Sequence, residues 1–200
     1  LSSLIKDQGL IPFFDCAYQG FGSSFEKDAF ALRHFLEQGH EMLISYSYSK
    51  NMSLYNDRLG ALCVVSNEAS HVPALESIIK VIIRRSYSNP PAWGSSLAKE
   101  VLSDAALYGE WQSELTIMRN RIVEMRHALS AGLAAHIHGQ DFSGLKIQQG
   151  MFSLLRIHKD QVDILAREWG VYMPDSGRIN VAGLSSKNIN YVIDAISAVL

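Results

Sequence analysis

Apolar and polar positions follow two different periods in the N-terminal half of the chain. Short apolar runs at residues 10–14, 42–45 and 59–65 are typical of buried strands. Over residues 24–38 and 72–85, apolar side chains instead recur every three or four positions, which predicts helices. Strands that alternate with helices in this way predict an α/β fold, with a mainly parallel sheet covered by helices.

A longer helical pattern follows in the second half of the chain. Seven apolar residues recur every three or four positions: Trp111, Leu115, Met118, Ile122, Met125, Leu129 and Leu133. This spacing predicts one long amphipathic helix, whose apolar side is a packing face and not a ligand site. Beyond it, the pattern predicts a small α+β unit with a strand near 146–157, a helix over 159–169, short strands near Val171 and 178–181, and a last helix over 186–199.

Composition is consistent with a globular protein. Hydrophobic residues make up 48% of the 200 residues and charged residues 19%, with a formal net charge of −2. The chain therefore lacks the excess of one charge expected of a nucleic-acid or membrane-surface binder. Two cysteines, Cys16 and Cys63, fit a reducing compartment better than a disulfide framework.

Residues of distinctive chemistry follow two of the predicted strands. Asp15 and Lys50 each fall just past the C-terminal end of a strand, where sheets of this kind bind their ligands. The two residues are therefore expected to share one site. Taken alone, Lys50 reads as a surface lysine and Asp15 as a turn residue after a strand.

An amine, a carboxylate and a phenol are groups that hold pyridoxal 5′-phosphate (PLP). The lysine amine forms a covalent bond with the aldehyde carbon of PLP, so Lys50 is the candidate attachment residue. A carboxylate beside the ring nitrogen keeps that nitrogen protonated, which suits Asp15. The phenol of Tyr18 suits a hydrogen bond to the ring oxygen; the alternative is a core aromatic with a satisfied hydroxyl.

Two hydroxyls and a guanidinium close to the lysine match the phosphate of PLP. Ser47 and Ser49 precede Lys50, and Arg58 follows it. Hydroxyl donors and a bidentate arginine fit phosphate oxygens well. The alternatives are that the serines cap a turn and that Arg58 is a surface charge.

Five blocks of sequence together resemble one family. They lie at residues 12–22, 47–60, 87–91, 150–153 and 176–183. In the same order and at similar spacing, these blocks resemble the class I aminotransferases of fold type I, and most closely aspartate aminotransferase.

The resemblance implies how the chain is divided. Residues 1–105 resemble the C-terminal part of the large PLP-binding domain, 106–135 a long interdomain helix and 136–200 the small C-terminal domain. Proteins of this family are about twice as long, so the chain resembles their C-terminal half. On its own it is expected to be inactive, because the N-terminal half supplies the phosphate-binding helix start and the aromatic ring that stacks on PLP.

The resemblance also assigns substrate contacts. It implies that Arg178 binds the substrate α-carboxylate and that Phe152 lines the same pocket, although Phe152 is also compatible with a core position. Arg84 would bind the side-chain carboxylate in the neighbouring subunit's site, and Ser88 would bind the neighbour's phosphate. The alternative for Arg84 is a basic residue favoured by the helix dipole.

The implied activity is ping-pong transfer of an amino group from aspartate to 2-oxoglutarate, which gives oxaloacetate and glutamate. Lys50 would move the proton at the substrate Cα. The resemblance implies a homodimer with shared sites, in the cytoplasm or the mitochondrial matrix, without nucleic-acid, membrane or metal partners. The alternatives are an aromatic or dual-specificity aminotransferase, or a catalytically inert fragment.

Some positions next to Lys50 differ from the family pattern. Met52 and Ser53 stand where many members have phenylalanine and glycine, and Asp57 stands where glutamate is common. None of these changes removes a group needed for the chemistry. They affect turn geometry and substrate preference instead.

Overall fold

A computed structural model describes residues 1–200 of the chain. The residues form two compact units. Unit 1 consists of residues 1–20 and 24–113, and unit 2 of residues 21–23 and 114–200. Each unit is described separately below.

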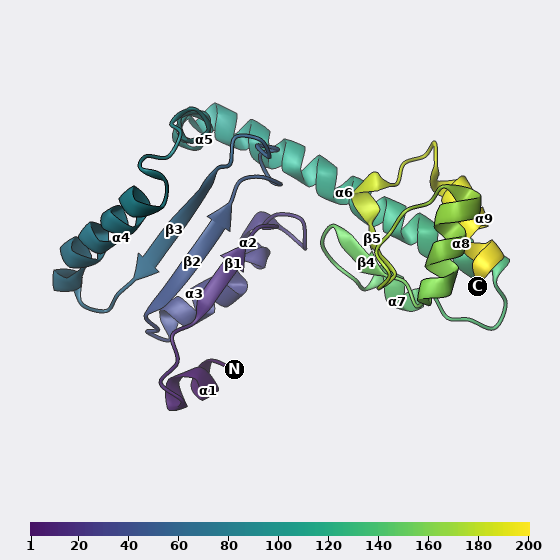
Figure 1. Cartoon of the computed structure of the whole chain (residues 1–200), viewed down its shortest axis with the longest axis horizontal. Helices are drawn as coiled ribbons and strands as arrows, with labels where there is room; N and C mark the ends of the chain where they lie inside the picture. Colours follow the sequence, from purple (N-terminus) through teal and green to yellow (C-terminus); the bar gives the residue numbers. More distant parts are fainter. The chain divides into compact units, whose positions relative to one another are not determined.

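Unit 1 combines a small sheet with short helices (Figure 1). Its elements are α1 (Ser2–Asp7), β1 (Phe13–Cys16), α2 (Phe25–Asp28), α3 (Phe30–Glu37), β2 (Met42–Ser47), β3 (Gly60–Val65), the 3₁₀ turn η1 (Ala69–His71), α4 (Val72–Tyr87) and α5 (Trp93–Ser103). The predicted alternation of strands and helices is confirmed for this unit, while α1 and α5 were not predicted.

The sheet of unit 1 is mixed, which corrects part of the prediction. Its order is β1-β2-β3, and β1 runs parallel to β2 with Asp15 opposite Ser45. β3 is antiparallel to β2, with Cys63 opposite Ile44. The reason lies in the connections. A parallel pair requires a crossover, which α2 and α3 supply between β1 and β2, whereas the loop 48–59 returns the chain directly without a helix.

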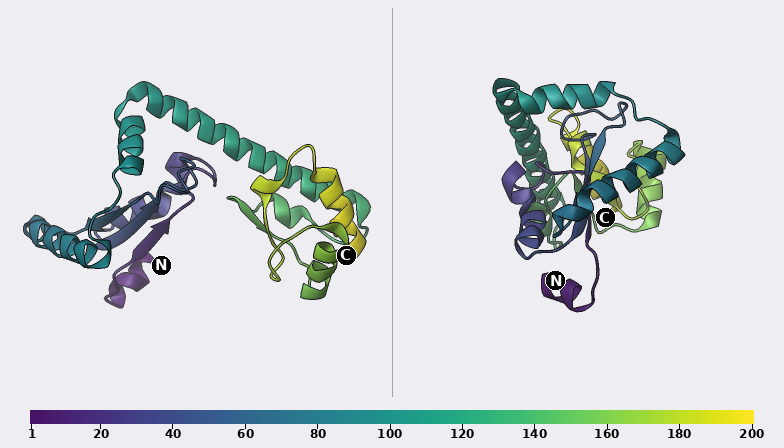
Figure 2. Two further views of the ribbon diagram at one scale, coloured as in Figure 1. Left: turned by 45° about the horizontal axis from the view of Figure 1, so that its top comes forward. Right: turned by 90° about the vertical axis from the view of Figure 1, so that its left-hand side faces the viewer.

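Helices lie on both faces of this sheet. α3 covers one face, where Phe35 meets Phe14 edge-on with ring centroids 5.2 Å apart. Phe35 and Met42 are buried there. The helix α4 lies along the second face of the sheet (Figure 2). On α4, Leu75 and Ile79 are only half-buried, so this helix leaves much apolar surface open.

Two predicted boundaries in unit 1 were wrong. Asp15 lies inside β1, one residue before its end, and not beyond the strand. The helix expected over 24–38 is two helices, α2 and α3, separated at Ala29. Its start was placed well, since the Ser24 side chain accepts a hydrogen bond of 3.0 Å from the backbone N–H of Lys27, as an N-cap residue does.

The long amphipathic helix is confirmed as α6 (Ala105–His136). Asp104 precedes it and accepts hydrogen bonds of 2.8 and 2.9 Å from the backbone N–H groups of Ala106 and Leu107. Residues 105–113 of α6 belong to unit 1 and the rest to unit 2. The predicted packing face is buried at Leu115, Ile122, Leu129 and Leu133.

Unit 2 is a small α+β unit, as the sequence predicts. It contains the end of α6, α7 (Ser143–Lys146), β4 (Phe152–Leu154), α8 (Lys159–Trp169), β5 (Arg178–Asn180), the 3₁₀ turn η2 (Val181–Gly183) and α9 (Ile189–Val199). β4 and β5 form an antiparallel pair in which Phe152 lies opposite Asn180. The core of the unit includes Leu165, Val181 and Ile196, which are almost completely buried.

The strand expected near Val171 is not formed. Gly170 adopts a left-handed conformation with φ 61° after the last residue of α8. The backbone N–H of Val171 then bonds to the carbonyl oxygen of Leu165 at 3.0 Å. Val171 therefore closes the helix end instead of starting a strand.

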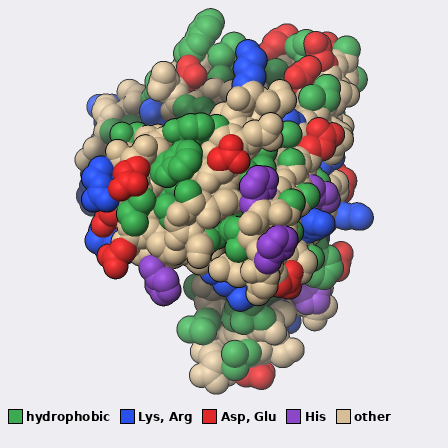
Figure 3. All heavy atoms as spheres, turned by 90° about the vertical axis from the view of Figure 1, so that its right-hand side faces the viewer, with side chains coloured by type: hydrophobic (Ala, Val, Ile, Leu, Met, Phe, Trp, Pro, Cys, Tyr) green, Lys and Arg blue, Asp and Glu red, His purple; other side chains and the backbone are tan.

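Charged side chains are mixed on the surface. On the face drawn in Figure 3, acidic, basic and histidine side chains are interspersed with apolar ones, and no extended patch carries one sign of charge. No helix is long and apolar enough to cross a membrane. Both findings agree with the balanced composition of the chain.

Candidate active site

The residues around Lys50 form a tight turn directly after β2. The backbone N–H of Met52 donates to the carbonyl of Tyr48 at 3.2 Å. The Tyr48 N–H in turn bonds to the carbonyl of Leu59 at 3.2 Å, which closes the loop at its base. We call residues 48–59 the lysine loop. Lys50 itself is half-buried and lies between two buried residues, Ser49 and Asn51.

The structure brings Lys50 and Tyr18 together. The Nζ atom of Lys50 lies 4.8 Å from the centroid of the Tyr18 ring. Tyr18 comes three residues after Asp15, whose strand pairs directly with the strand that leads to Lys50. These three candidates are therefore contributed by two adjacent strands and the loops that follow them.

The residues expected to bind the phosphate lie near the two ends of the lysine loop. The hydroxyl oxygen of Ser47 accepts a hydrogen bond of 3.2 Å from the backbone N–H of Ser49, so Ser47 does cap the turn. Its own O–H remains able to donate. At the other end, Arg58 donates from Nη1 to the carbonyl of Tyr55 at 2.8 Å.

Two residues of the lysine loop have a left-handed backbone without being glycine. These are Ser53, with φ 57°, and Arg58, with φ 50°. A side chain makes this conformation unfavourable, and such residues concentrate at functional sites. The loop is therefore held in a conformation that its own sequence does not favour.

Arg84 and Ser88 form a separate pair at the end of α4. Nη1 of Arg84 donates to the Ser88 hydroxyl oxygen at 2.7 Å. Ser88 has φ 71° and ψ −73°, and the N–H of Asn89 bonds to the carbonyl of Tyr87 at 2.9 Å. This is a γ-turn of the rare, strained kind. No hydrogen bond or ion pair joins this pair to the lysine loop within the chain.

Arg178 and Phe152 lie together in unit 2. The guanidinium carbon of Arg178 is 4.9 Å from the centroid of the Phe152 ring. Both residues line a cavity of about 370 Å³, which Tyr172, Asn180 and Asn188 also line. A cationic group beside an aromatic ring in such a cavity suits a small anionic molecule with an apolar part.

Sequence reasoning missed three residues that support these sites. Trp111 was interpreted only as a packing residue, but its indole N–H donates to the carbonyl of Asn51 at 2.6 Å. Asn51 itself is 1% exposed. The third is Arg126, which is 2% exposed. Its position within the apolar face of α6 was the available signal, because a charge on that face must be buried.

Arg126 holds the segment that carries Phe152. Its Nε donates to the hydroxyl of Ser153 at 3.0 Å, and its Nη2 donates to the carbonyl of Gly150. Burial lowers the pKa of Arg126 from its ordinary value. The guanidinium thus binds the residues on both sides of Met151 and Phe152, without a carboxylate partner.

The set of donors fits PLP, and it does not fit a metal ion. An amine, a carboxylate, a phenol, two hydroxyls and a guanidinium are all present on β1, on β2 and in the loops that follow these two strands. Asp15, Lys50 and Arg58 form no salt bridge within the chain, so their charges remain available to a ligand. No group of three or more His, Cys, Asp or Glu side chains is placed to hold a metal ion.

Comparison with known proteins identifies the class of protein. The chain matches the family Aminotransferase class I and II over residues 1–196 and belongs to that family. Members of this family depend on PLP, in agreement with the donor set described above.

Aspartate aminotransferases are among the relatives of the chain. The chain is 43% identical over 201 residues to aspartate aminotransferase 1 of Medicago sativa, covering 100% of this chain and 48% of the relative. It is 44% identical over 200 residues to the aspartate aminotransferase of Salmonella typhi, covering 100% of this chain and 50% of that protein. The chain thus spans about half the length of these relatives.

Solved structures agree in fold. The aromatic-amino-acid aminotransferase of Burkholderia pseudomallei, which is covalently bound to pyridoxal phosphate, superimposes with a TM-score of 0.97 at 41% identity, covering 100% of this chain and 50% of that one. An aromatic aminotransferase of Psychrobacter sp. B6, cocrystallised with aspartic acid, gives 0.96 at 41% identity, covering 99% and 50%. Relatives include cytoplasmic, mitochondrial and chloroplastic proteins.

Proposed function

We propose that this chain is the part of a PLP-dependent aminotransferase that carries the covalent attachment residue, Lys50. One observation carries the proposal most strongly: Lys50 is a half-buried residue whose Nζ lies 4.8 Å from the centroid of the Tyr18 ring and forms no ion pair. A lysine in such a position is available for covalent chemistry, whereas a structural lysine would pair with a carboxylate.

Each candidate residue has a role toward the cofactor. Asp15 would keep the ring nitrogen protonated, and Tyr18 would hydrogen-bond the ring oxygen. Ser47, Ser49 and Arg58 would hold the phosphate. Bound there, PLP supplies a ring that withdraws electrons from the substrate Cα.

Lys50 then has a second task as a base. Displaced from the cofactor by the substrate amine, the Lys50 amine would take the proton from the substrate Cα and deliver it to the cofactor carbon that carried the aldehyde. The Nζ atom must therefore stay close enough to the substrate Cα to take its proton. The position of the lysine loop therefore matters as much as the presence of the amine.

The proposed substrates are aspartate and 2-oxoglutarate, with oxaloacetate and glutamate as products. Arg178 would bind the α-carboxylate beside Phe152. Arg84 would bind the side-chain carboxylate in the partner subunit's site, and Ser88 would reach the phosphate there. In this view residues 1–105 belong to a large domain, 106–135 form the interdomain helix and 136–200 form the small domain of a homodimer in the cytoplasm or the mitochondrial matrix.

A second candidate is an aromatic or dual-specificity aminotransferase. It is favoured by the two aromatic aminotransferases that superimpose with TM-scores of 0.97 and 0.96, one of which was cocrystallised with aspartic acid. A protein of that kind accepts both classes of amino acid. Turnover of phenylalanine as well as aspartate would favour this second candidate, and turnover of aspartate alone would favour the first.

The proposal is tested by the rate of amino transfer in the complete protein that contains residues 1–200, which we call the intact protein. Lys50→Ala should abolish amino transfer from aspartate, because it removes both the attachment residue and the base. Lys99→Ala changes an exposed lysine of α5 and should leave turnover unchanged. If Lys50→Ala retained the wild-type rate with PLP present, the proposal would be wrong.

Substrate recognition is tested by two arginine variants. Arg178→Ala should weaken every amino-acid substrate, and Arg84→Ala should weaken only dicarboxylic ones. Each change removes a charge-assisted contact. The resulting fall in kcat/KM should correspond to a loss of about 2–5 kcal/mol in transition-state stabilisation. Equal losses for aspartate and phenylalanine in Arg84→Ala would contradict its role in specificity.

A further inference from the structure

The indole of Trp111 reaches the backbone next to Lys50. Trp111 lies in the part of α6 that belongs to unit 1. Its Nε1–H donates to the carbonyl oxygen of Asn51 at 2.6 Å. This carbonyl belongs to the residue that directly follows Lys50, although Trp111 is 60 positions away in the sequence.

A second contact holds Asn51 from the opposite side of the chain. Nδ2 of Asn51 donates to the phenol oxygen of Tyr46 on β2 at 2.9 Å. Burial raises the pKa of Tyr46 to about 12, which keeps this phenol neutral at physiological pH. Asn51 is thus fixed by α6 through its main chain and by β2 through its side chain.

One polar atom of the Asn51 side chain has no partner within the chain. Its Oδ1 atom is buried and has no hydrogen-bond partner. A buried polar atom left unpaired costs about 1–3 kcal/mol. Such atoms are uncommon in native proteins.

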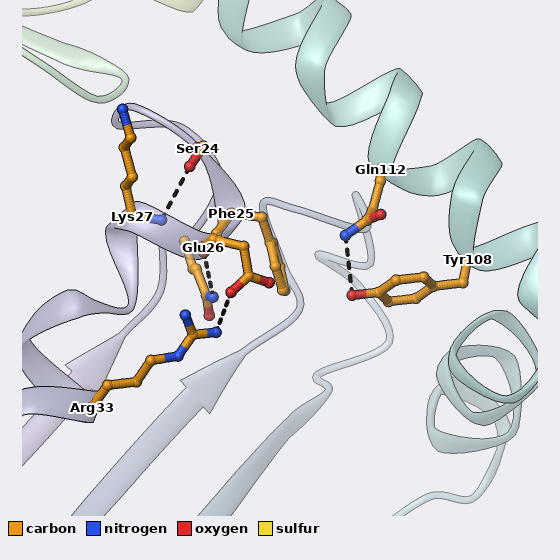
Figure 4. A network of polar contacts seen from close by, with 8 residues as sticks. Ser24, Phe25, Glu26, Lys27, Arg33, Tyr108 and Gln112 are labelled. Carbon is orange, nitrogen blue, oxygen red and sulfur yellow. Dashed lines mark hydrogen bonds and ion pairs between the residues drawn. The ribbon is translucent and has the colours of Figure 1, made fainter. Parts of the chain in front are cut away.

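The Trp111 ring is itself held in place by aromatic neighbours. The Phe25 ring meets it edge-on with centroids 5.2 Å apart, and Tyr108 lies at 5.6 Å. Both neighbours are fixed in turn. Figure 4 shows Phe25 directly after the Ser24 cap of α2, and the Gln112 amide donating to the Tyr108 hydroxyl at 3.0 Å one turn along α6. The direction of the indole N–H is therefore set by packing.

We infer that Trp111 is a positioning residue for Lys50. By holding the Asn51 carbonyl, it fixes the turn that begins at Tyr48 and so keeps the lysine amine over the Tyr18 ring. The lysine loop needs such support because Ser53 and Arg58 adopt unfavourable backbone conformations. The inference rests on the proposed function for the role of Lys50, but the contact itself can be tested without cofactor.

The first test uses Trp111→Phe in the intact protein without PLP. Phenylalanine keeps an aromatic ring beside Phe25 and removes the N–H donor. Hydrogen–deuterium exchange should become about tenfold faster at the amides of Met52 and Ser53, whose hydrogen bonds close the turn around Lys50. Trp169→Phe serves as the matched control, because the Trp169 ring packs against Tyr191 in unit 2, and it should leave these amides unchanged.

A general loss of stability must be distinguished from a local effect. Exchange in α8, a helix of unit 2, should stay as in the wild type. If exchange in the lysine loop did not change, or if α8 accelerated by the same factor, the inference would be overturned. Tyr46→Phe, which removes the acceptor of the Asn51 side chain, provides a second variant with the same expected pattern.

The second test uses the PLP-loaded protein. Trp111→Phe should lower kcat by about 10- to 100-fold, because a small displacement of a catalytic group is enough for such a loss. KM should stay within about twofold. An unchanged kcat despite faster exchange would overturn the positioning role. If the wild type neither binds PLP nor turns over substrate, the proposed function fails, and the exchange result alone decides whether Trp111 holds the loop.

Discussion

At the scale of single residues, Ser53 is the clearest case of a side chain in an unfavourable backbone conformation. Its φ of 57° is a value that glycine tolerates better than serine. Ser53→Gly should therefore stabilise the protein by about 0.5–1 kcal/mol, measured by chemical denaturation.

Gly39 offers the reverse control for Ser53. It has φ 71°, and a Cβ atom there would meet nothing within 4 Å. Gly39→Ala should thus destabilise the protein by about 1 kcal/mol through backbone conformation alone. A loss of stability in Ser53→Gly would show that the serine side chain makes a contribution that outweighs its strain.

Arg126 is a buried charge whose partners are a carbonyl and a hydroxyl. Arg126→Met should destabilise the protein by about 2–4 kcal/mol, because Gly150 and Ser153 would lose their donor inside the core. Arg121→Met is a matched control on the same helix. Arg121 also donates to two backbone oxygens, of Leu184 and Ala182, at 2.7 and 3.0 Å, but it is exposed.

The expected difference between these two arginines has a physical reason. Water can replace Arg121 at the surface, so its loss should cost less than about 1 kcal/mol. Denaturation midpoints of both variants measure the difference. Equal effects would mean that burial of Arg126 does not determine its contribution.

At the scale of elements, Gly132 is a position where α6 packs tightly against α9. A Cβ atom at Gly132 would lie 2.2 Å from Cδ1 of Ile193, a buried residue of α9. Gly132→Ala should therefore destabilise unit 2 by about 1–3 kcal/mol, although alanine is the better helix former. Gly109→Ala in the same helix meets nothing within 4 Å and should stabilise it by about 1 kcal/mol.

A double variant tests the steric cause. Ile193→Val removes Cδ1, the nearest of the three Ile193 atoms that the new Cβ would meet. In a double-mutant cycle, the combination with Gly132→Ala should be less destabilising than the sum of the two single changes. If the two changes in the free energy of unfolding simply added, a clash with Ile193 would not be the cause of the effect of Gly132→Ala.

Elements were predicted well where one local signal decided them. The periodic apolar face of α6 and the Ser24 cap are examples, because neither depends on distant contacts. The direction of β3 and the failure of a strand at Val171 were not predicted, since both depend on how the chain returns after a loop or a helix end. In the site, the roles of Lys50, Asp15 and Arg178 stay predictions from the sequence, because no ligand contact tests them.

The supporting contacts of the site were not predictable in the same way. Trp111 and Asn51 are far apart in the sequence, and their hydrogen bond exists only because α6 passes the lysine loop in unit 1. The apolar spacing around Trp111 also predicted a packing residue only, without a hydrogen bond to a distant backbone. Contacts of this kind combine a packing role with a polar one, and the hydrophobic pattern reports only the first.

At the scale of the whole molecule, unit 1 exposes apolar side chains on its sheet and on α4. Phe13 and Leu62 are 65% and 53% exposed, and Ile78 and Ile82 are both 57% exposed. β1 and β3 are the two edges of the sheet, and open edges promote association. Residues 1–200 produced alone should therefore self-associate in sedimentation experiments.

Charged substitutions on α4 test the source of this association. Ile78→Lys together with Ile82→Lys should shift residues 1–200 toward monomer. Ile117→Lys replaces a residue of α6 that is 61% exposed and should change the association little. A wild-type chain of residues 1–200 that stays monomeric would overturn this view of the exposed surface.

The attachment of PLP to Lys50 is the central claim, and one measurement tests it most directly. The intact protein is incubated with PLP, reduced with borohydride and digested, and the mass of the added pyridoxyl group is located by peptide mapping. We predict that the group is found on Lys50. Attachment to Lys6, Lys80 or Lys99 in its place, or to no lysine at all, would contradict the account.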